Sequence, residues 1–147
     1  MNTPNDRQSW MSLLAKAPSD LLATIWDRSG FAPQFNTLRA PEIGAVMVRG
    51  RMGGTGSAFN LGEMTITRCS VQLEGGAVGH AYVQGRDGDK ARVAALVDAL
   101  MQSAQADQVR AGILEPLQKA AEAARTQRAA KAAATKVDFF TMARGED

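Results

Sequence analysis

The segment best suited to bind an anion joins two arginines to a loop dense in glycine. Arg49 and Arg51 stand two residues apart in a β-rich run, and the loop follows directly. Glycine has no Cβ, so such a loop can adopt positive φ and bring its backbone N–H groups close to a ligand. Guanidinium groups bind phosphate or carboxylate through paired N–H donors. The candidate residues of the loop are Gly53, Gly54, Thr55 and Gly56.

The named phosphate-binding motifs do not fit this loop. A Walker A loop needs lysine and then serine or threonine after its last glycine, whereas Gly56 is followed by Ser57 and Ala58. A dinucleotide fingerprint needs its third glycine where Phe59 stands. Two interpretations stay open: a looser backbone nest for an anion, or a strand connection that is structural or docks a subunit.

Two more arginines, Arg68 and Arg86, are candidates for anion binding or for a subunit interface. If Arg68 lies on a buried sheet face, its charge needs a partner, which indicates a functional or interface role. If the arginines instead line the solvated face of an antiparallel sheet, Glu63 and Asp87 are suitable ion-pair partners. The sequence leaves both interpretations open.

The chain carries one histidine, His80, and one cysteine, Cys69. A zinc or iron site normally takes several such ligands, so we expect no metal bound by this chain alone. A serine or cysteine triad would have to use His80 as its imidazole. His80 shares a strand face with Tyr82, and a hydrogen-bonded structural role suits such a histidine better than a catalytic one. We therefore predict no catalytic residue and keep His80 as a binding or interface candidate.

The composition is that of one globular domain spanning residues 1–147. Hydrophobic residues make up 45% and charged residues 22%, which provides for a core and excludes a disordered chain. A net charge of +2, without a basic stretch interleaved with aromatic residues, argues against nucleic-acid binding. No apolar run approaches the roughly 20 residues of a membrane span, and the first residues do not resemble a signal peptide. We expect a cytoplasmic protein without membrane contact.

The periodicity of apolar residues predicts an α+β fold. A helical pair is expected over 6–30, capped by Asn5 or Asp6. Residues 34–84 alternate as three or four antiparallel strands in a meander, and helices follow over 87–134. The inward face of the longest strand should carry Thr65, Thr67, Cys69, Val71 and Leu73.

Residues with special backbone preferences mark the expected ends of these elements. Gly30 should stop the second helix, and Gly75–Gly76 supplies a hairpin turn. Asp87 or Asp89 should cap the helix after the sheet. Pro116 should break or restart the next helix, because proline lacks a backbone donor.

The chain ends in an alanine-rich helix, residues 117–134, and a tail. Alanine forms helices readily but buries little apolar area per turn, so this helix should dock onto something else. We interpret 136–145 as an extended, strand-like tail that packs on the body or on a partner. The docking candidates in it are Phe139, Phe140, Met142 and Arg144.

Several segments occur in the order typical of one protein family. The most specific are Gly53–Gly56 (GGTG) and residues 137–141 (VDFFT), and matching segments extend from about Ser9 to Gly145. On these segments the chain resembles the G-subunit family of the bacterial carbon–phosphorus lyase system for phosphonate breakdown.

The resemblance implies a subunit that does not work alone. In that family the G, H, I and J subunits form a symmetric core complex, and G, H and I act together with the L subunit. Methylphosphonate attacks the ribose C1 of ATP and adenine leaves, which gives alpha-D-ribose 1-methylphosphonate 5-triphosphate. The I subunit resembles the catalyst and is the expected direct partner of G. The J subunit, a radical SAM enzyme with an iron–sulfur cluster, acts later.

For this chain the resemblance implies neither a catalytic residue nor a cofactor of its own, since ATP is a substrate of the whole complex. One alternative belongs to another class of protein. It is a small module that binds an anion or a nucleoside triphosphate through Arg49, Arg51 and the Gly53–Gly56 backbone, without catalytic activity.

Overall fold

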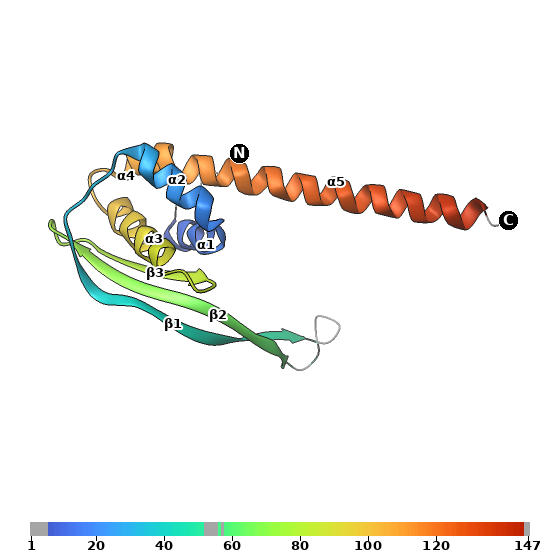
Figure 1. Cartoon of the computed structure of the whole chain (residues 1–147), viewed down its shortest axis with the longest axis horizontal. Coiled ribbons are helices and arrows are strands. Elements are labelled where there is room, and N and C mark those ends of the chain that lie inside the picture. Colours follow the sequence, from blue (N-terminus) through green and yellow to red (C-terminus); the bar gives the residue numbers. More distant parts are fainter. Residues whose placement is uncertain (1–5, 52–55, 57, 146–147) are drawn as a thin grey trace.

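A computed structural model of the chain describes residues 6–51, 56 and 58–145, with backbone alone for Arg51, 58–60 and 137–145. Two short helices precede three strands, and further helices complete the chain (Figure 1). The elements are α1 (Arg7–Lys16), α2 (Ser19–Ser29), β1 (Phe35–Arg51), β2 (Ala58–Leu73), β3 (Val78–Gln84), α3 (Gly88–Met101), α4 (Ala106–Val109), a π-helix (Arg110–Leu114) and α5 (Glu115–Gly145). The predicted α+β class is confirmed.

The helix ends follow the local chemistry of the sequence. The Asp6 carboxylate caps α1 by accepting from the Ser9 backbone N–H at 2.8 Å. Gly30 ends α2 in the left-handed conformation (φ 74°), which a residue without Cβ adopts at little cost. Asp87 caps α3 by accepting from the Lys90 backbone N–H at 3.0 Å. These three expectations are confirmed.

The three strands form an antiparallel meander in the order β1-β2-β3, as predicted. The turn between β2 and β3 uses Gly76 at φ 102°, whose N–H donates to the Leu73 carbonyl at 2.8 Å. β3 pairs with β2 only from Ile66 to Gln72, whereas the β1–β2 ladder continues outward to Arg51 and Ala58. The outer part of the sheet is therefore a two-stranded arm that projects from the body (Figure 1).

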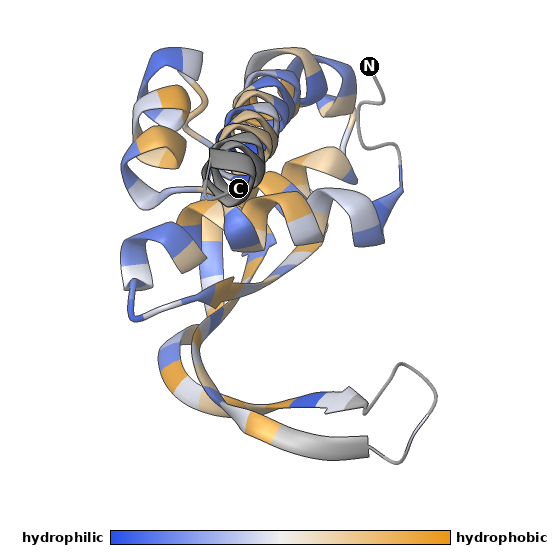
Figure 2. Cartoon of the chain, turned by 90° about the vertical axis from the view of Figure 1, so that its right-hand side faces the viewer, coloured by the Kyte–Doolittle hydropathy of each residue, from blue (hydrophilic) through white to orange (hydrophobic). Residues whose placement is uncertain are grey.

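The core lies between α3 and the inner face of β2 and β3. Thr67, Cys69, Val71 and Leu73 of β2 are buried there, as predicted, whereas Thr65 at the outer end of the same predicted face is only half-buried. In β3 the buried positions are Gly79, Ala81 and Val83. Figure 2 shows that the apolar residues of the body gather between the helices and this part of the sheet. α1 and α2 also contact α3 and so close the core.

β3 and α3 approach each other unusually closely at Gly79. A Cβ placed on Gly79 would stand 2.7 Å from the Ala99 backbone nitrogen and 2.9 Å from the Ala99 Cβ, and it would overlap the Ala95 carbonyl oxygen. Only glycine therefore fits at this point of the strand, and only small residues fit opposite it. The alanines of α3 provide this close packing.

α5 follows the π-helix directly, because Glu115 keeps helical backbone angles (φ −62°, ψ −47°), so the chain stays helical through Pro116 and the predicted break there does not occur. Leu117 is buried in the core, but every residue from 123 to 136 is exposed. The helix then continues to Gly145, so the extended tail predicted over 136–145 is wrong. Its backbone is helical because neither glycine nor proline occurs between Leu117 and Arg144 to stop the alanine-rich helix.

Candidate functional site

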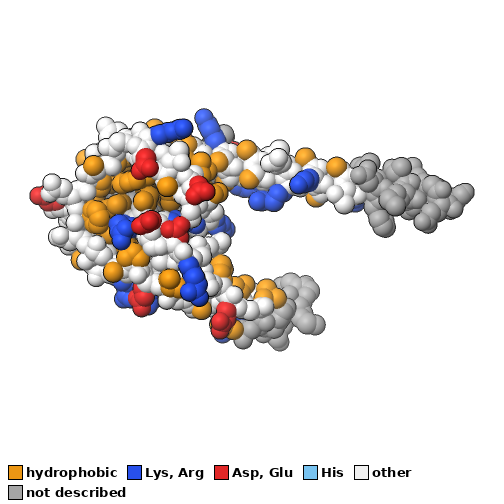
Figure 3. Space-filling view, viewed as in Figure 1, with side chains coloured by type: hydrophobic (Ala, Val, Ile, Leu, Met, Phe, Trp, Pro, Cys, Tyr) orange, Lys and Arg blue, Asp and Glu red, His pale blue; other side chains and the backbone are white. Residues whose placement is uncertain are grey.

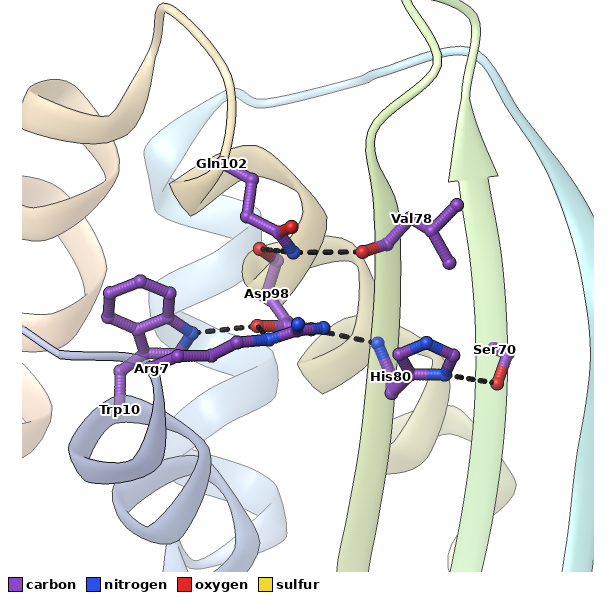
Figure 4. Close-up of polar contacts among 7 residues, drawn as sticks. All are labelled: Arg7, Trp10, Ser70, Val78, His80, Asp98 and Gln102. Carbon is purple, nitrogen blue, oxygen red and sulfur yellow. Dashed lines mark hydrogen bonds and ion pairs between the residues drawn. The ribbon is translucent and has the colours of Figure 1, made fainter.

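The most connected polar side chain in the described structure is Asp98 of α3, which is fully buried (Figure 4). Its Oδ1 accepts from Trp10 Nε1 at 2.8 Å and from Arg7 Nε at 3.2 Å. Its Oδ2 accepts from Arg7 Nη2 and from the backbone N–H of His80, both at 2.8 Å. Four donors thus satisfy one carboxylate, and they join α1, α3 and β3 at a single point.

This arrangement stabilises the fold rather than offering a reactive group. The hydrogen bond to Asp98 raises the pKa of the Arg7 guanidinium above its ordinary range, so Arg7 stays charged. Gln102 extends the network, since its side-chain amide donates to the Val78 carbonyl at 2.8 Å. Sequence reasoning missed this group. The one signal available was a carboxylate inside the apolar run 94–101 of a helix.

Lys90, at the start of α3, is the other charged side chain among the buried residues described. Its Nζ donates to the Ala15 carbonyl at 3.0 Å and so holds the end of α1 against α3. Burial lowers the pKa of Lys90 from its ordinary value of 10.5, although the nearby Asp87 carboxylate acts in the opposite direction. The contact is structural, because the ammonium is directed at a helix end.

His80 lies on the outer, exposed face of β3, as the sequence pattern predicts. Its Nδ1 lies 2.8 Å from the Ser70 hydroxyl on β2. The nearby Asp98 carboxylate contacts the backbone N–H of His80 on the other face of the strand, not the imidazole (Figure 4). A serine–histidine pair is therefore present without an acid to orient the imidazole among the described side chains, which does not amount to a triad.

Arg68 also lies on this outer face and is not buried, since 41% of its side chain is exposed. The interpretation as a solvated sheet face holds, but the partner differs from those predicted. Arg68 Nη2 lies 3.4 Å from Glu42 Oε2, and Arg39 Nη1 lies 2.9 Å from the same oxygen. The hydrogen bond from Arg39, followed by that from Arg68, lowers the pKa of Glu42 from its ordinary value of 4.5.

Three of the candidate arginines, Arg49, Arg68 and Arg86, do not lie together in the sheet. Arg49 pairs with Asn60 in the projecting arm, whereas Arg68 stands opposite Glu42. Seven residues of β1 separate these two ladder positions, which corresponds to about 23 Å along the strand. Arg86 lies elsewhere again, exposed in the bend after β3.

Other candidates fall wholly or partly outside the described residues. Gly53, Gly54 and Thr55 lie outside them, and Gly56 is the one residue of the loop that is described. The side chains of Arg51 and of the docking candidates in α5 also lie outside the description. Those docking candidates are Phe139, Phe140, Met142 and Arg144.

The outer sheet and the arm expose an unusual number of large apolar side chains. Six of them have between 40% and 62% of their surface in solvent, which is typical of a surface that another protein covers. They come from β1, β2 and β3, so they follow the sheet from the body into the arm. They are Leu38, Ile43, Val46, Met47, Leu61 and Tyr82.

Metal and thiol chemistry have little basis in the part of the chain that the structure describes. Within residues 6–51, 56 and 58–145, no three His, Cys, Asp or Glu side chains gather as a metal site. Cys69 is buried, and burial raises the pKa of its thiol from the ordinary value of 9.0. None of the helices described is long and apolar enough to cross a membrane.

Comparison with known proteins identifies the family. The chain matches the family model described as "Phosphonate metabolism protein PhnG" over residues 5–145. It is also 45% identical over 141 residues to the alpha-D-ribose 1-methylphosphonate 5-triphosphate synthase subunit PhnG of Rhizobium meliloti (strain 1021). That alignment covers 96% of this chain and 90% of the relative. The chain therefore belongs to the PhnG family of phosphonate metabolism proteins.

Proposed function

We propose that this chain is the G subunit of an alpha-D-ribose 1-methylphosphonate 5-triphosphate synthase and that it works only within the assembled enzyme. The observation that carries the proposal is the 45% identity, over 96% of the chain, to a protein named as that subunit. In the complex, methylphosphonate would replace adenine at the ribose C1 of ATP. The use of ATP supports a cytoplasmic location.

The surfaces of the chain support a role in assembly. The projecting arm and the outer sheet expose large apolar side chains, and residues 123–136 of α5 have no cover within this chain. Some charged groups of the body are already engaged within the chain, as Arg7 is with Asp98 and Arg68 is with Glu42. We propose the H, I and J subunits as partners, I most directly, with L acting functionally.

The division of labour follows from the same observations. The Ser70–His80 pair has no orienting acid among the described side chains, so we propose that catalytic groups come from other subunits. We propose that this chain binds no cofactor of its own and that the iron–sulfur cluster and SAM belong to J.

The test is reconstitution. An affinity-tagged form of this chain is co-expressed with the H, I and J subunits, and the purified assembly is supplied with L, ATP and methylphosphonate. We expect the subunits to copurify and adenine to be released, whereas preparations without this chain release little adenine. Full adenine release without this chain, or release by this chain alone, would overturn the proposal.

A further inference from the structure

A groove of about 1060 Å³ runs between α1 and the inner half of α5. Leu13 of α1 and Leu117 of α5 lie in its apolar part. Three alanines of α5, Ala120, Ala121 and Ala124, line one side. Small side chains at these positions keep the wall shallow, so that another backbone can come close to α5.

The groove carries a net positive charge. Lys16 of α1 and both Arg125 and Arg128 of α5 line it, and among the described lining residues Asp6 alone carries a carboxylate. Three positive charges and one negative charge leave a balance of +2. A cationic groove of this kind favours an anionic occupant and lowers the affinity for a cationic one.

The charge continues beyond the groove along the exposed part of α5. Residues 123–136 contain four lysines and arginines and no aspartate or glutamate. Successive residues of a helix are about 100° apart, so Arg125, Arg128 and Lys131 fall within about 120° of one another around the axis. Figure 3 shows blue side chains along the lower edge of the projecting part of α5, on the side that faces the sheet. The basic stripe thus extends the basic groove.

An exposed helix of this kind is incomplete without a partner. Helices in proteins owe most of their stability to packing of one face, and residues 123–136 have no such packing within the chain. The four positive charges also repel one another along α5, since the nearest carboxylates in sequence, Glu122 and Asp138, flank this stretch and do not interrupt it. A negatively charged partner that covers the stripe would pack against the exposed helix face and reduce the repulsion between its positive charges.

We propose that the groove and the basic stripe of α5 hold an acidic helix of another subunit. The proposal rests on the proposed function, because it presumes a multi-subunit enzyme. A helix suits the site because the groove lies between two helices, and an alanine wall permits close helix packing. A second copy of this chain is a less suitable occupant, since residues 123–136 of its own α5 would bring the same four positive charges.

Zero-length crosslinking of the assembled complex tests the location directly. A carbodiimide joins a lysine amine only to a carboxylate in direct contact. We expect Lys16 and Lys131 to crosslink to glutamates or aspartates within one helical segment of a partner subunit. Lys119 is the internal control, because it lies on α5 but does not line the groove. Crosslinks from Lys119 alone would overturn the proposal.

A pair of charge-matched variants tests how much the basic side chains contribute to the affinity for the other subunits. The groove variant combines Arg125→Gln, Arg128→Gln and Lys131→Gln, which changes the net charge by −3. The control combines Ala123→Glu, Ala130→Glu and Ala133→Glu, which also changes it by −3 but on the opposite side of the same exposed helix. We expect the groove variant to weaken binding to the co-expressed H, I and J subunits about tenfold at 0.15 M salt, and the control less than twofold. Circular dichroism checks that both variants remain helical.

The outcomes separate this inference from the proposed function. If the wild-type chain does not copurify with the other subunits, the proposed function fails. If the wild type assembles and both variants assemble equally well or equally poorly, the acidic helix is ruled out. Calorimetry with ATP tests whether the groove binds a free polyphosphate instead of a helix. If the wild type binds ATP and the groove variant does not, while both bind the other subunits equally well, the groove is a polyphosphate site and the proposal is wrong.

Discussion

α3 and the outer half of α5 are both helices rich in alanine, yet their surroundings are opposite. In α3 the residues Ala91, Ala94, Ala95 and Ala99 are at most 1% exposed. From 123 to 136 in α5, every alanine is exposed. The residues between the alanines account for the difference. In α3 most of the residues between the alanines are apolar (Val93, Leu96 and Val97, beside Arg92 and Asp98), whereas in α5 they are arginine, lysine, glutamine and threonine.

The contrast shows that alanine has two different uses in this chain. In α3 it allows close packing, because Gly79 of β3 contacts the helix where Ala95 and Ala99 stand. In α5 it supplies helix propensity, which keeps the helix formed as it leaves the body. Matched substitutions in the two regions should therefore have very different effects, and each prediction below compares a packed site with an exposed one where the chain offers both.

The largest difference is expected for the same change in the two helices. Ala99→Glu places a charged side chain in a fully buried position that touches β3, and should cost about 5 kcal/mol or more, enough to unfold the chain. Ala130→Glu lies in solvent and should change the free energy of unfolding by less than about 0.5 kcal/mol. Urea titration followed by circular dichroism measures both. Equal effects would mean that the outer half of α5 packs on this chain after all.

Removal of the buried carboxylate should have the next largest effect. Asp98→Ala leaves the Trp10 indole N–H and the His80 backbone N–H buried without their acceptor, and should cost about 4 kcal/mol. Asp89→Ala on the same helix removes a carboxylate that is 96% exposed, and should cost at most about 0.5 kcal/mol. Thermal unfolding of the two variants provides the comparison. A loss below 1 kcal/mol for Asp98→Ala would contradict the structural role given to this carboxylate.

A third comparison uses two glycines in strands. Gly79→Ala pushes a methyl group into the backbone of α3 and should destabilise the chain by about 3 kcal/mol. Gly44→Ala lies in β1, where nothing stands within 4 Å of the added Cβ, and should be neutral or stabilise by about 0.5 kcal/mol. Chemical denaturation distinguishes them. Tolerance of Gly79→Ala would show that β3 can move away from α3.

Several features of the fold were predictable from local sequence. The alternation of Thr67, Cys69 and Val71 identified the buried face of β2, and Gly30 and Asp87 marked helix ends, because each signal depends on nearby residues. The role of Asp98 was not predictable in this way. Its donors Arg7 and Trp10 are 91 and 88 residues away along the chain, and only the folded structure brings them together.

The two wrong expectations also have physical causes. Glu63 cannot pair with Arg68, because both lie on β2 five residues apart and so face opposite sides of the sheet, whereas Glu42 of β1 stands directly opposite Arg68 in the ladder. The predicted strand-like tail is helical because an established helix extends more easily than a new element starts. The sequence pattern indicated that His80 lies on the exposed face of β3. It did not indicate the groove between α1 and α5, because that groove depends on tertiary packing.

The smallest expected effect concerns the pH dependence at the start of α3. The hydrogen bond from the Ser19 side chain, and then that from the Lys90 backbone N–H, lower the pKa of Asp87 from its ordinary value of 3.8. A carboxylate whose pKa is lower in the folded state than in the unfolded state stabilises the fold above the unfolded value. That stabilisation is lost as the pH falls from about 3.8 through the lowered pKa.

Asp87→Asn should therefore remain folded and lose only this part of the pH dependence, because asparagine also caps helices. Between pH 5 and the acid transition, the midpoint of thermal unfolding should fall less steeply for the variant than for the wild type. Asp89→Asn is the matched control, because Asp89 lies two residues further on, in the first turn of the same helix, and its side chain is 96% exposed. If both variants follow the wild-type curve, the contact that joins α2, α3 and the end of β3 does not depend on the charge of Asp87.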